Sequence, residues 1–401
     1  MSELQKAFAK AHLQKLPPEP PPTFDERDEE DDNLNDLPPT SPNDSSSSAS
    51  SVDSTDTIIP SPSRKLFERP RGTATRSRSG PLPWNDFFSQ ELFLSHPTNP
   101  DLTFHAYLTP PTNGPLIVTH HGAGSSGLSF ATFYQSLATL LPSAGILSLD
   151  CRGHGLTSCP EPLDLNLPTL AADLAFVVHA TFKQSSWPTL PPVILIGHSL
   201  GGAVVTEVAH TSLLSNTLLG YGVLDVVEGS AIDALQSMES YLSTRPRSFP
   251  SIASGIEWHT RSRTIRNTTS ARVSVPPLLT PSDPPTTPEL FSWRTDLSAT
   301  KPFWENWFVG LSSKFLNSRG GKLLILAGTD RLDKDLMIGQ MQGKYQLQVF
   351  PDAGHFVHED QPLKTAQVVA DFYRRNDRSG LVLPPKVGEL IKQGVVKGGG
   401  H

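Results

Sequence analysis

The sequence predicts an α/β fold whose mostly parallel central sheet is covered by helices on both faces. Six apolar runs, each four to six residues long and bounded by turn-forming residues, are typical of buried strands. Helical-looking segments such as 169–183 and 200–214 separate most of these runs. Strands that are apolar on both faces and alternate with helices favour a parallel sheet buried on both sides.

The six predicted strands each end in a loop rich in glycine or polar residues. In chain order they lie within "GPLIVTHHGAG", "GILSLDCRGHG", "PPVILIGHSLGG", "LLGYGVLDVVEG", "KLLILAGTDRLD" and "YQLQVFPDAGHF". Functional residues of such sheets gather where the carboxyl ends of the strands meet the loops. The candidate catalytic residues discussed below all follow one of these ends.

The composition changes sharply near residue 81. Residues 1–80 are acidic and rich in Pro and Ser, and they lack the apolar content needed to offset the entropy of ordering, so we predict a disordered tail. We expect a folded domain over 81–378 with a cap inserted at about 229–310, and a C-terminal tail over 379–401. The run Asp25–Asp32 holds seven acids and one arginine, so its −6 nearly accounts for the net charge of −7. A nearly neutral folded part carries no nucleic-acid footprint.

Other features bear on the compartment. No run approaches 18 apolar residues, and the first 16 residues are amphipathic rather than continuously apolar, so neither a membrane span nor a secretory signal is expected. Two cysteines, Cys151 and Cys159, are too few for a disulfide framework and fit a reducing compartment. We therefore expect the cytosol or the nucleus, with no nucleic-acid or membrane partner.

A serine stands between glycines where the third apolar run ends, in Gly197-His198-Ser199-Leu200-Gly201. A strand that turns sharply into a helix exposes its turn residue, and small neighbours at 197 and 201 let strand and helix approach closely. The positive helix end lies beneath the serine, and the Leu200 amide can donate to a developing oxyanion. We predict that Ser199 is a nucleophile. The alternative is a purely structural turn.

A serine nucleophile requires a general base. His355 follows the last predicted strand and a glycine, in "FPDAGHFVHED", and the chain order of serine, acid and histidine expected for such a sheet favours it. His358 is the competitor, expected on the next helix. His120 and His121 precede the serine in the chain, so neither suits the role.

Two aspartates compete to orient the base. Asp330 follows the fifth predicted strand but stands among charged residues typical of a solvated loop. Asp225 follows the fourth strand and has apolar neighbours on both sides, so it should be buried and in need of a partner such as an imidazole N–H. Burial favours Asp225 and leaves Asp330 open.

The second oxyanion donor should come from the glycine-rich loop after the first strand, "HHGAGSSG". We predict that Ala123 and Gly124 donate their amides, together with Leu200, and that Gly122 permits the turn. An ordinary tight turn is the alternative reading of these glycines.

Several long motifs together resemble one known family. They are "PLPWNDFF", "LIGHSLGGA", "LDVVEGSAIDAL", "RPRSFPSI", "IEWHTRSRTIRNTTSARVSVP" and "AGTDRLDKDLMIGQMQGKYQLQVFPDAGHFVHEDQP". They resemble the protein phosphatase methylesterases, which have the α/β-hydrolase fold, over about residues 81–376. The resemblance implies Ser199 as nucleophile, His355 as base and Asp225 rather than Asp330 as acid. It also implies hydrolysis of the methyl ester on the C-terminal leucine of the protein phosphatase 2A catalytic subunit, a chemistry that requires no metal or organic cofactor.

The segment expected to form the cap contains candidates for substrate recognition. Trp304 and Trp307 could anchor the phosphatase or, as we favour, form the interior of the cap. Arg245 and Arg247 suit a cover over the strand ends but could equally be solvated. The proline-rich stretch 275–288 and the acidic tail depart from the family pattern.

Two other functions compete with the methylesterase. One is a small-molecule esterase, lipase or thioesterase on the same fold, and the other is a phosphatase-binding regulator whose hydrolase site is vestigial. The presence of serine, aspartate and histidine argues against a complete loss of chemistry.

Overall fold

The computed structural model describes residues 80–160, 163–285, 288–328 and 332–377. The chain divides into two compact units, 1–71 and 72–401, and every described residue belongs to the second. The predicted disordered and C-terminal tails lie outside the described residues, apart from Gly80. So does Asp330, the alternative acid.

The central sheet has eight strands in the order β1-β2-β4-β3-β5-β6-β10-β11. From β4 to β11 every neighbouring pair is parallel, which confirms the predicted sheet. The six predicted strands are all present, as β3 (Leu116–His120), β4 (Gly145–Leu149), β5 (Val193–His198), β6 (Leu218–Leu224), β10 (Gly321–Leu326) and β11 (Gln346–Val349). Their carboxyl ends therefore meet at one edge of the sheet, where the site is assembled.

An antiparallel hairpin that the apolar runs did not indicate extends the sheet. It comprises β1 (Gln90–His96) and β2 (Asn99–Thr109), and β2 pairs antiparallel with β4. The residues of β1 alternate between exposed and buried, as expected for a strand with one face in solvent. A search for continuous apolar runs misses such a strand.

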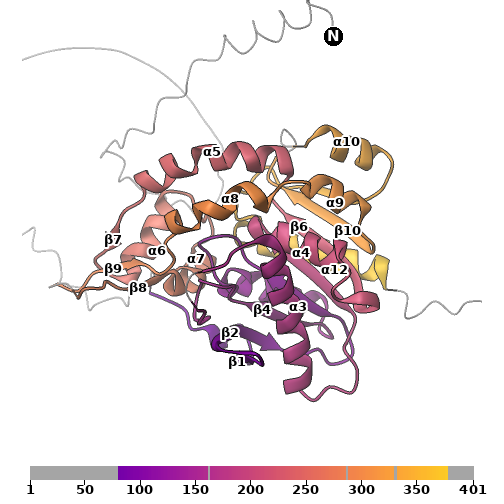
Figure 1. The fold of residues 1–401 in the computed structure, drawn as a ribbon, viewed down its shortest axis with the longest axis horizontal. Helices are drawn as coiled ribbons and strands as arrows, with labels where there is room; N and C mark the ends of the chain where they lie inside the picture. Colours follow the sequence, from indigo (N-terminus) through magenta and orange to yellow (C-terminus); the bar gives the residue numbers. More distant parts are fainter. Residues whose placement is uncertain (1–79, 161–162, 286–287, 329–331, 378–401) are drawn as a thin grey trace, which may run out of the picture. The chain divides into compact units, whose positions relative to one another are not determined.

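Helices cover both faces of the sheet (Figure 1). One core cluster packs α3 (Leu167–Gln184), α4 (Leu200–His210) and α9 (Leu311–Asn317) against one face. The other packs α2 (Ala131–Leu140), α11 (Val357–Asp360) and α12 (Pro362–Asn376) against the opposite face. Helices α3 and α4 match the predicted helical segments, although α4 ends four residues earlier. The remaining helix of the core, α10 (Lys334–Met341), precedes β11.

The segment between β6 and α9 corresponds to the predicted cap. It contains the helices α5 (Glu228–Thr244), α6 (Ile252–Arg261), α7 (Thr268–Ser274) and α8 (Lys301–Trp307), and a three-stranded antiparallel sheet of β7 (Ser248–Phe249), β9 (Phe291–Trp293) and β8 (Leu279–Pro281). Part of the proline-rich stretch is thus ordered as β8. Helices α5 and α8 run beside each other along one side of the molecule (Figure 1).

Not all of the inserted segment stands apart from the core. Trp304 and Trp307 are only 6% and 2% exposed and belong to the core cluster that includes α3 and α4. Their indole N–H groups donate within the protein, to Thr300 Oγ1 and to the Leu165 carbonyl respectively. A role for them as surface anchors is therefore wrong, and the alternative of an interior role is correct. Within the described residues, no helix is both long and apolar enough to cross a membrane.

Candidate active site

The turn between β5 and α4 holds its serine in an unusual backbone conformation. Ser199 has φ 53° and ψ −119°, a region that non-glycine residues rarely adopt. Its amide donates to the Leu224 carbonyl at 3.0 Å, and its carbonyl accepts from the Gly202 amide at 2.8 Å. These bonds hold a strained residue at the strand-to-helix junction, as the sequence motif predicts.

Both flanking glycines are required for the close approach of backbone segments. A Cβ at Gly197 would lie 2.0 Å from the Gly201 carbonyl oxygen, and a Cβ at Gly201 would lie 2.1 Å from the His120 carbonyl oxygen. Real Cβ atoms do not approach backbone this closely. The spacing of small residues around Ser199 is therefore a packing requirement of β5, α4 and the loop after β3.

The base and one of the two candidate acids are in direct contact. His355 Nδ1 donates to Asp225 Oδ2 at 2.9 Å. The Asp225 side chain is fully buried, whereas the His355 side chain is 45% exposed. An exposed imidazole edge held by a buried carboxylate is the arrangement that fixes the tautomer of a general base.

Asp225 is held by its own backbone as well as by its carboxylate. It has φ 51°, and its amide donates to the Ile325 carbonyl at 2.8 Å. Its second oxygen, Oδ1, accepts from the Ala327 amide at 2.8 Å. The predicted burial is thus present, and the partner that it required is an imidazole N–H.

Two further histidines lie behind His355. His198 Nε2 donates to the His355 carbonyl at 2.9 Å, and the two rings are 4.6 Å apart. Burial, and then the proximity of His355, lowers the pKa of His198 well below its usual value. The competitor His358 begins the next helix as expected, but it is fully buried, and burial lowers its pKa to about 3. His358 therefore packs beneath the site and does not face the cavity.

Ser199 and His355 share the wall of two adjoining cavities. Among the described residues no hydrogen bond joins Ser199 Oγ to His355 Nε2. Such bonds are often long in the absence of substrate and tighten in the reacting complex. The residues are nevertheless neighbours, since both line each cavity.

The two cavities differ in chemistry. The first, of about 680 Å³, is lined by aromatic and basic side chains of the cap, including Arg245, Trp258 and Trp293. The second, of about 610 Å³, is mainly apolar and lies beneath α5, with Leu235 and Met238 in its wall. A reacting carbonyl at Ser199 can thus extend one substituent into the first chamber, which is the more polar of the two, and another into the apolar one.

The oxyanion loop differs in detail from the prediction. The Gly124 amide donates to His154 Nε2 at 2.8 Å, so the prediction that Gly124 supplies an oxyanion donor is wrong. Its φ of +74° makes the turn that was assigned to Gly122. A Cβ at Gly122 would lie 3.0 Å from His198 Nδ1 and 3.1 Å from Ser199 Cβ, so a larger residue there would have to displace these side chains slightly.

The amides of Ala123 and Leu200 are the best-placed candidates to bind an oxyanion, since Gly122 does not line the apolar cavity. Within the part of the chain that the structure describes, the amides of Ala123 and Leu200 donate to no acceptor. Both residues line the apolar cavity together with Ser199 and His355. These amides come from the loop after β3 and from the first residue of α4, the two places where the sequence motifs predicted donors.

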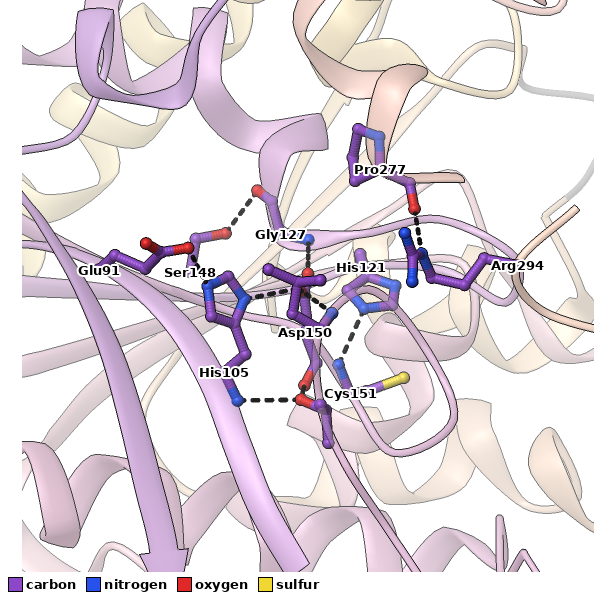
Figure 2. A network of polar contacts seen from close by, with 11 residues as sticks. Glu91, His105, His121, Gly127, Ser148, Asp150, Cys151, Pro277 and Arg294 are labelled. Carbon is purple, nitrogen blue, oxygen red and sulfur yellow. Dashed lines mark hydrogen bonds and ion pairs between the residues drawn. The ribbon is translucent and has the colours of Figure 1, made fainter. Parts of the chain in front are cut away.

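A polar network beneath the oxyanion loop was not foreseen (Figure 2). Asp150 Oδ1 accepts from the Gly127 amide at 2.7 Å, and Asp150 Oδ2 accepts from His105 Nδ1 at 2.7 Å. His105 Nε2 contacts Glu91 Oε1 at 2.8 Å. Burial opposes a charge on His105, but the two carboxylates raise its pKa above the usual value. Glu91 lies on β1 and His105 on β2, and the apolar runs predicted neither strand. The network could therefore not be predicted from them.

The cap arginines have separate environments. The Arg245 guanidinium lies 3.6 Å from the centre of the Trp293 ring and faces the first cavity. Burial lowers the pKa of Arg245. Arg247, two residues on, is exposed. The reading of both as solvated charges therefore holds for Arg247 and is wrong for Arg245.

Comparisons with known proteins agree with this geometry. The sequence model of the Alpha/beta hydrolase family matches residues 117–368. Protein phosphatase methylesterase 1 of Aspergillus oryzae is 60% identical, with 100% of this chain and 96% of the relative covered. This chain belongs to the protein phosphatase methylesterase family of α/β hydrolases. As a family member it is a carboxylic ester hydrolase, and the expected fold class and family are confirmed.

A more distant relative and a solved structure are also similar to this chain. Protein phosphatase methylesterase 1 of Schizosaccharomyces pombe is 46% identical, with 76% of this chain and 88% of the relative covered. Among solved structures, E-2-(acetamidomethylene)succinate hydrolase has a TM-score of 0.56 at 19% identity, covering 71% of this chain and 98% of that chain. At that identity the structural likeness shows the fold alone.

Proposed function

We propose that this methylesterase removes the methyl group from the C-terminal leucine of the protein phosphatase 2A catalytic subunit. The observation that carries the proposal is the hydrogen bond of 2.9 Å between the buried Asp225 and the half-exposed His355, at a cavity wall that also holds Ser199 on its strained turn. The names of the relatives supply the substrate class. The residue roles below are part of the proposal.

The arrangement supports an acyl-enzyme mechanism. Ser199 Oγ attacks the ester carbonyl while His355 Nε2 accepts its proton, and Asp225 stabilises the imidazolium that forms. The oxyanion of the tetrahedral intermediate accepts hydrogen bonds from the Ala123 and Leu200 amides. His355 then protonates the leaving oxygen, and methanol departs. Water repeats the sequence on the acyl-enzyme and leaves a free carboxylate on the phosphatase.

The two cavities support selection of a peptide terminus. A methyl group offers little surface for recognition, so selectivity must come from the acyl side of the ester. The polar chamber, with Arg245, Trp258 and Trp293, suits an extended peptide. The apolar chamber beneath α5 suits a leucine side chain.

The test uses methylated phosphatase catalytic subunit and follows methyl loss. Wild-type protein should release methanol, Ser199→Ala should release none, and Asp225→Asn should be slower by several orders of magnitude. Asp330→Asn should retain activity, and a crippled Asp330→Asn with an active Asp225→Asn would reverse the assignment of the acid. Wild-type protein that binds the phosphatase but leaves every methyl in place would favour a regulator instead.

The apolar cavity favours a second candidate, a small-molecule esterase. Its volume of about 610 Å³ lies within the range of ligand sites. The two functions are separated by comparing kcat/KM for short acyl esters with kcat/KM for the methylated phosphatase. A higher value for the small esters would make the phosphatase a secondary substrate.

A further inference from the structure

The peptide group that joins Gly122 to Ala123 is fixed from its carbonyl side. The Gly122 carbonyl accepts from His121 Nδ1 at 2.8 Å and from the Ser125 amide at 3.2 Å. A trans peptide group is planar, and its C=O and N–H point in opposite directions. A hydrogen bond that fixes the Gly122 oxygen therefore also fixes the direction of the Ala123 N–H, one of the two amides that face the reacting centre.

We propose that His121 is a positioning residue that aims the Ala123 amide at the oxyanion. The inference rests on the proposed function, because it takes the Ala123 amide as an oxyanion donor. His121 does not line either cavity that holds Ser199, and it acts through the Gly122–Ala123 peptide group. His121 precedes the serine in the chain and does not suit the role of general base, but a positioning role does not require that chain order.

The hydrogen bonds of His121 define its protonation. Nδ1 contacts a carbonyl, which only accepts, so Nδ1 carries the proton. Nε2 accepts from the Cys151 amide at 3.0 Å, so Nε2 carries none (Figure 2). The ring is fully buried, and burial, followed by the nearby His154 and His120, lowers its pKa well below the usual value. His121 is thus a neutral imidazole held in one tautomer by the loop after β4.

The next peptide group is fixed by a second imidazole. The Gly124 amide donates to His154 Nε2 at 2.8 Å, and His154 Nδ1 donates to the Arg152 carbonyl at 2.9 Å. The two rings are 5.1 Å apart. Both peptide groups that flank the Ala123 Cα are therefore oriented by buried neutral histidines. Within the described residues the Ala123 amide donates to no acceptor, and Ala123 lines both cavities that hold Ser199.

A matched pair of substitutions separates the two ends of the His121 ring. In His121→Asn the amide nitrogen takes the place of Nδ1 and can still donate to the Gly122 carbonyl. In His121→Gln the terminal oxygen takes the place of Nε2 and can still accept from the Cys151 amide, but no donor reaches Gly122. Loss of a complete oxyanion donor lowers kcat by about 10² to 10³. We expect His121→Gln to lower kcat by about tenfold to a hundredfold, and His121→Asn to stay within a few-fold of wild type.

The experiment measures kcat and KM for methylated phosphatase and for p-nitrophenyl acetate, with thermal unfolding of each variant. It also measures inhibition by phenylboronic acid, whose tetrahedral serine adduct places an oxygen at the oxyanion position. In His121→Gln the affinity for the boronic acid should fall in parallel with kcat, while KM changes little. His120→Gln is the control, because it removes an Nδ1 hydrogen bond to the His121 carbonyl. The N–H of that peptide group belongs to Gly122, which is not one of the two proposed oxyanion donors.

The outcomes distinguish this inference from the proposed function. If wild-type protein does not demethylate the phosphatase, the proposed function fails, and p-nitrophenyl acetate still tests the role of His121. The role of His121 is overturned if His121→Gln keeps its kcat, if His121→Asn loses as much kcat as His121→Gln, or if the boronic acid binds both equally. If His121→Gln does not fold, the same measurements are made on His154→Gln and His154→Asn. In that pair the Gln variant should keep its activity, because the Gly124 amide donates to Nε2 of His154.

Discussion

The catalytic core and the cap differ in how tightly their residues are held. In the core, β3, β4 and β5 are buried along their whole length, and the glycines around Ser199 contact backbone atoms with no room for a methyl group. In the cap, the 17-residue helix α5 buries only Ala231. An exposed ion pair of 2.6 Å between Lys301 and Glu239 links α5 to α8, and such pairs contribute little stability.

This difference separates two tasks. The core fixes the reacting atoms, and a small displacement there reduces the rate steeply. The cap supplies about half of the wall of the first cavity and more than half of the wall of the second, and loosely packed elements open at low free-energy cost. Changes in the core should therefore affect folding or kcat, whereas changes in the cap should affect KM. The following predictions test that separation, beginning with the largest effect.

Two glycine-to-alanine substitutions compare the regions directly. In the core, Gly201→Ala places a methyl group 2.1 Å from the His120 carbonyl oxygen, so the free energy of unfolding should fall by more than about 4 kcal/mol. In the cap, Gly229 in α5 has nothing within 4 Å of its added Cβ, and Gly229→Ala should be neutral or stabilise by up to about 1 kcal/mol. Urea denaturation measures both. Equal losses would contradict the comparison.

Asp225→Asn should be the next largest change. It keeps the shape of a fully buried side chain but removes the charge that stabilises the imidazolium and fixes its tautomer. We expect kcat to fall by about 10⁴ with KM nearly unchanged. Steady-state kinetics on the methylated phosphatase measure this effect. A change confined to KM would remove Asp225 from the catalytic machinery.

Glu359 lies where the cap meets the core, in α11 beside Ser274 of α7, and it should make stability depend on pH. Burial, reinforced by Asp360, raises the pKa of Glu359 to about 8. Between its unfolded value of 4.5 and about 8, the folded state retains a proton that the unfolded state has lost. Stability is therefore greatest below pH 4.5 as far as this group is concerned, and it falls as pH rises, by at most about 1.4 kcal/mol per unit.

The variant Glu359→Gln mimics the protonated carboxyl at every pH. The difference in melting temperature between Glu359→Gln and wild type should therefore grow in favour of the variant from pH 5 to pH 8. Burial lowers the pKa of histidines such as His120 to about 4, and such groups make stability rise with pH. Their contribution is the same in both proteins, so it cancels in this difference. If the melting temperatures of the two proteins change in parallel from pH 5 to pH 8, Glu359 is ionised in the folded protein.

The smallest predicted effect concerns the cap wall. Arg245→Ala removes a guanidinium that lies 3.6 Å from the centre of the Trp293 ring, an interaction of about 0.5–2 kcal/mol. We expect KM for the methylated phosphatase to rise several-fold with kcat unchanged. Arg247→Ala is the control, since Arg247 is exposed and does not line the larger cavity. A fall in kcat in Arg245→Ala would break the proposed division between core and cap.

The sequence sufficed for the parallel sheet and for the positions of the proposed catalytic residues. Buried parallel strands are continuous apolar runs, and the functional groups follow their carboxyl ends, so Ser199, Asp225 and His355 could be located without coordinates. The hairpin β1–β2 could not, because a strand with one solvent-exposed face is only half apolar. The network of Glu91, His105 and Asp150 depends on that hairpin and was missed with it.

The details of the oxyanion loop also required the structure. The sequence predicted that Gly122 permits the turn and that Gly124 donates its amide, but the structure places the positive φ at Gly124 and bonds its amide to His154. Which of them turns the chain, and which amide is already bonded, depends on the contact between Gly124 and His154, 30 residues apart in the chain. The same holds for Arg245, whose environment depends on Trp293. It also holds for Trp304 and Trp307, whose burial depends on contacts with distant parts of the chain such as Leu165.

The main-chain bonds of the nucleophile and the acid have a consequence for inactivation. Ser199 donates its amide to the end of β6, and Asp225 donates its amide to the end of β10. The spacing of the reacting groups is therefore the spacing of adjacent sheet strands, so these two amides should exchange with deuterated solvent as slowly as the innermost strands. Heating should abolish the chemical step only when the whole cooperative unit melts, whereas fraying of α5 at a lower temperature should raise KM first.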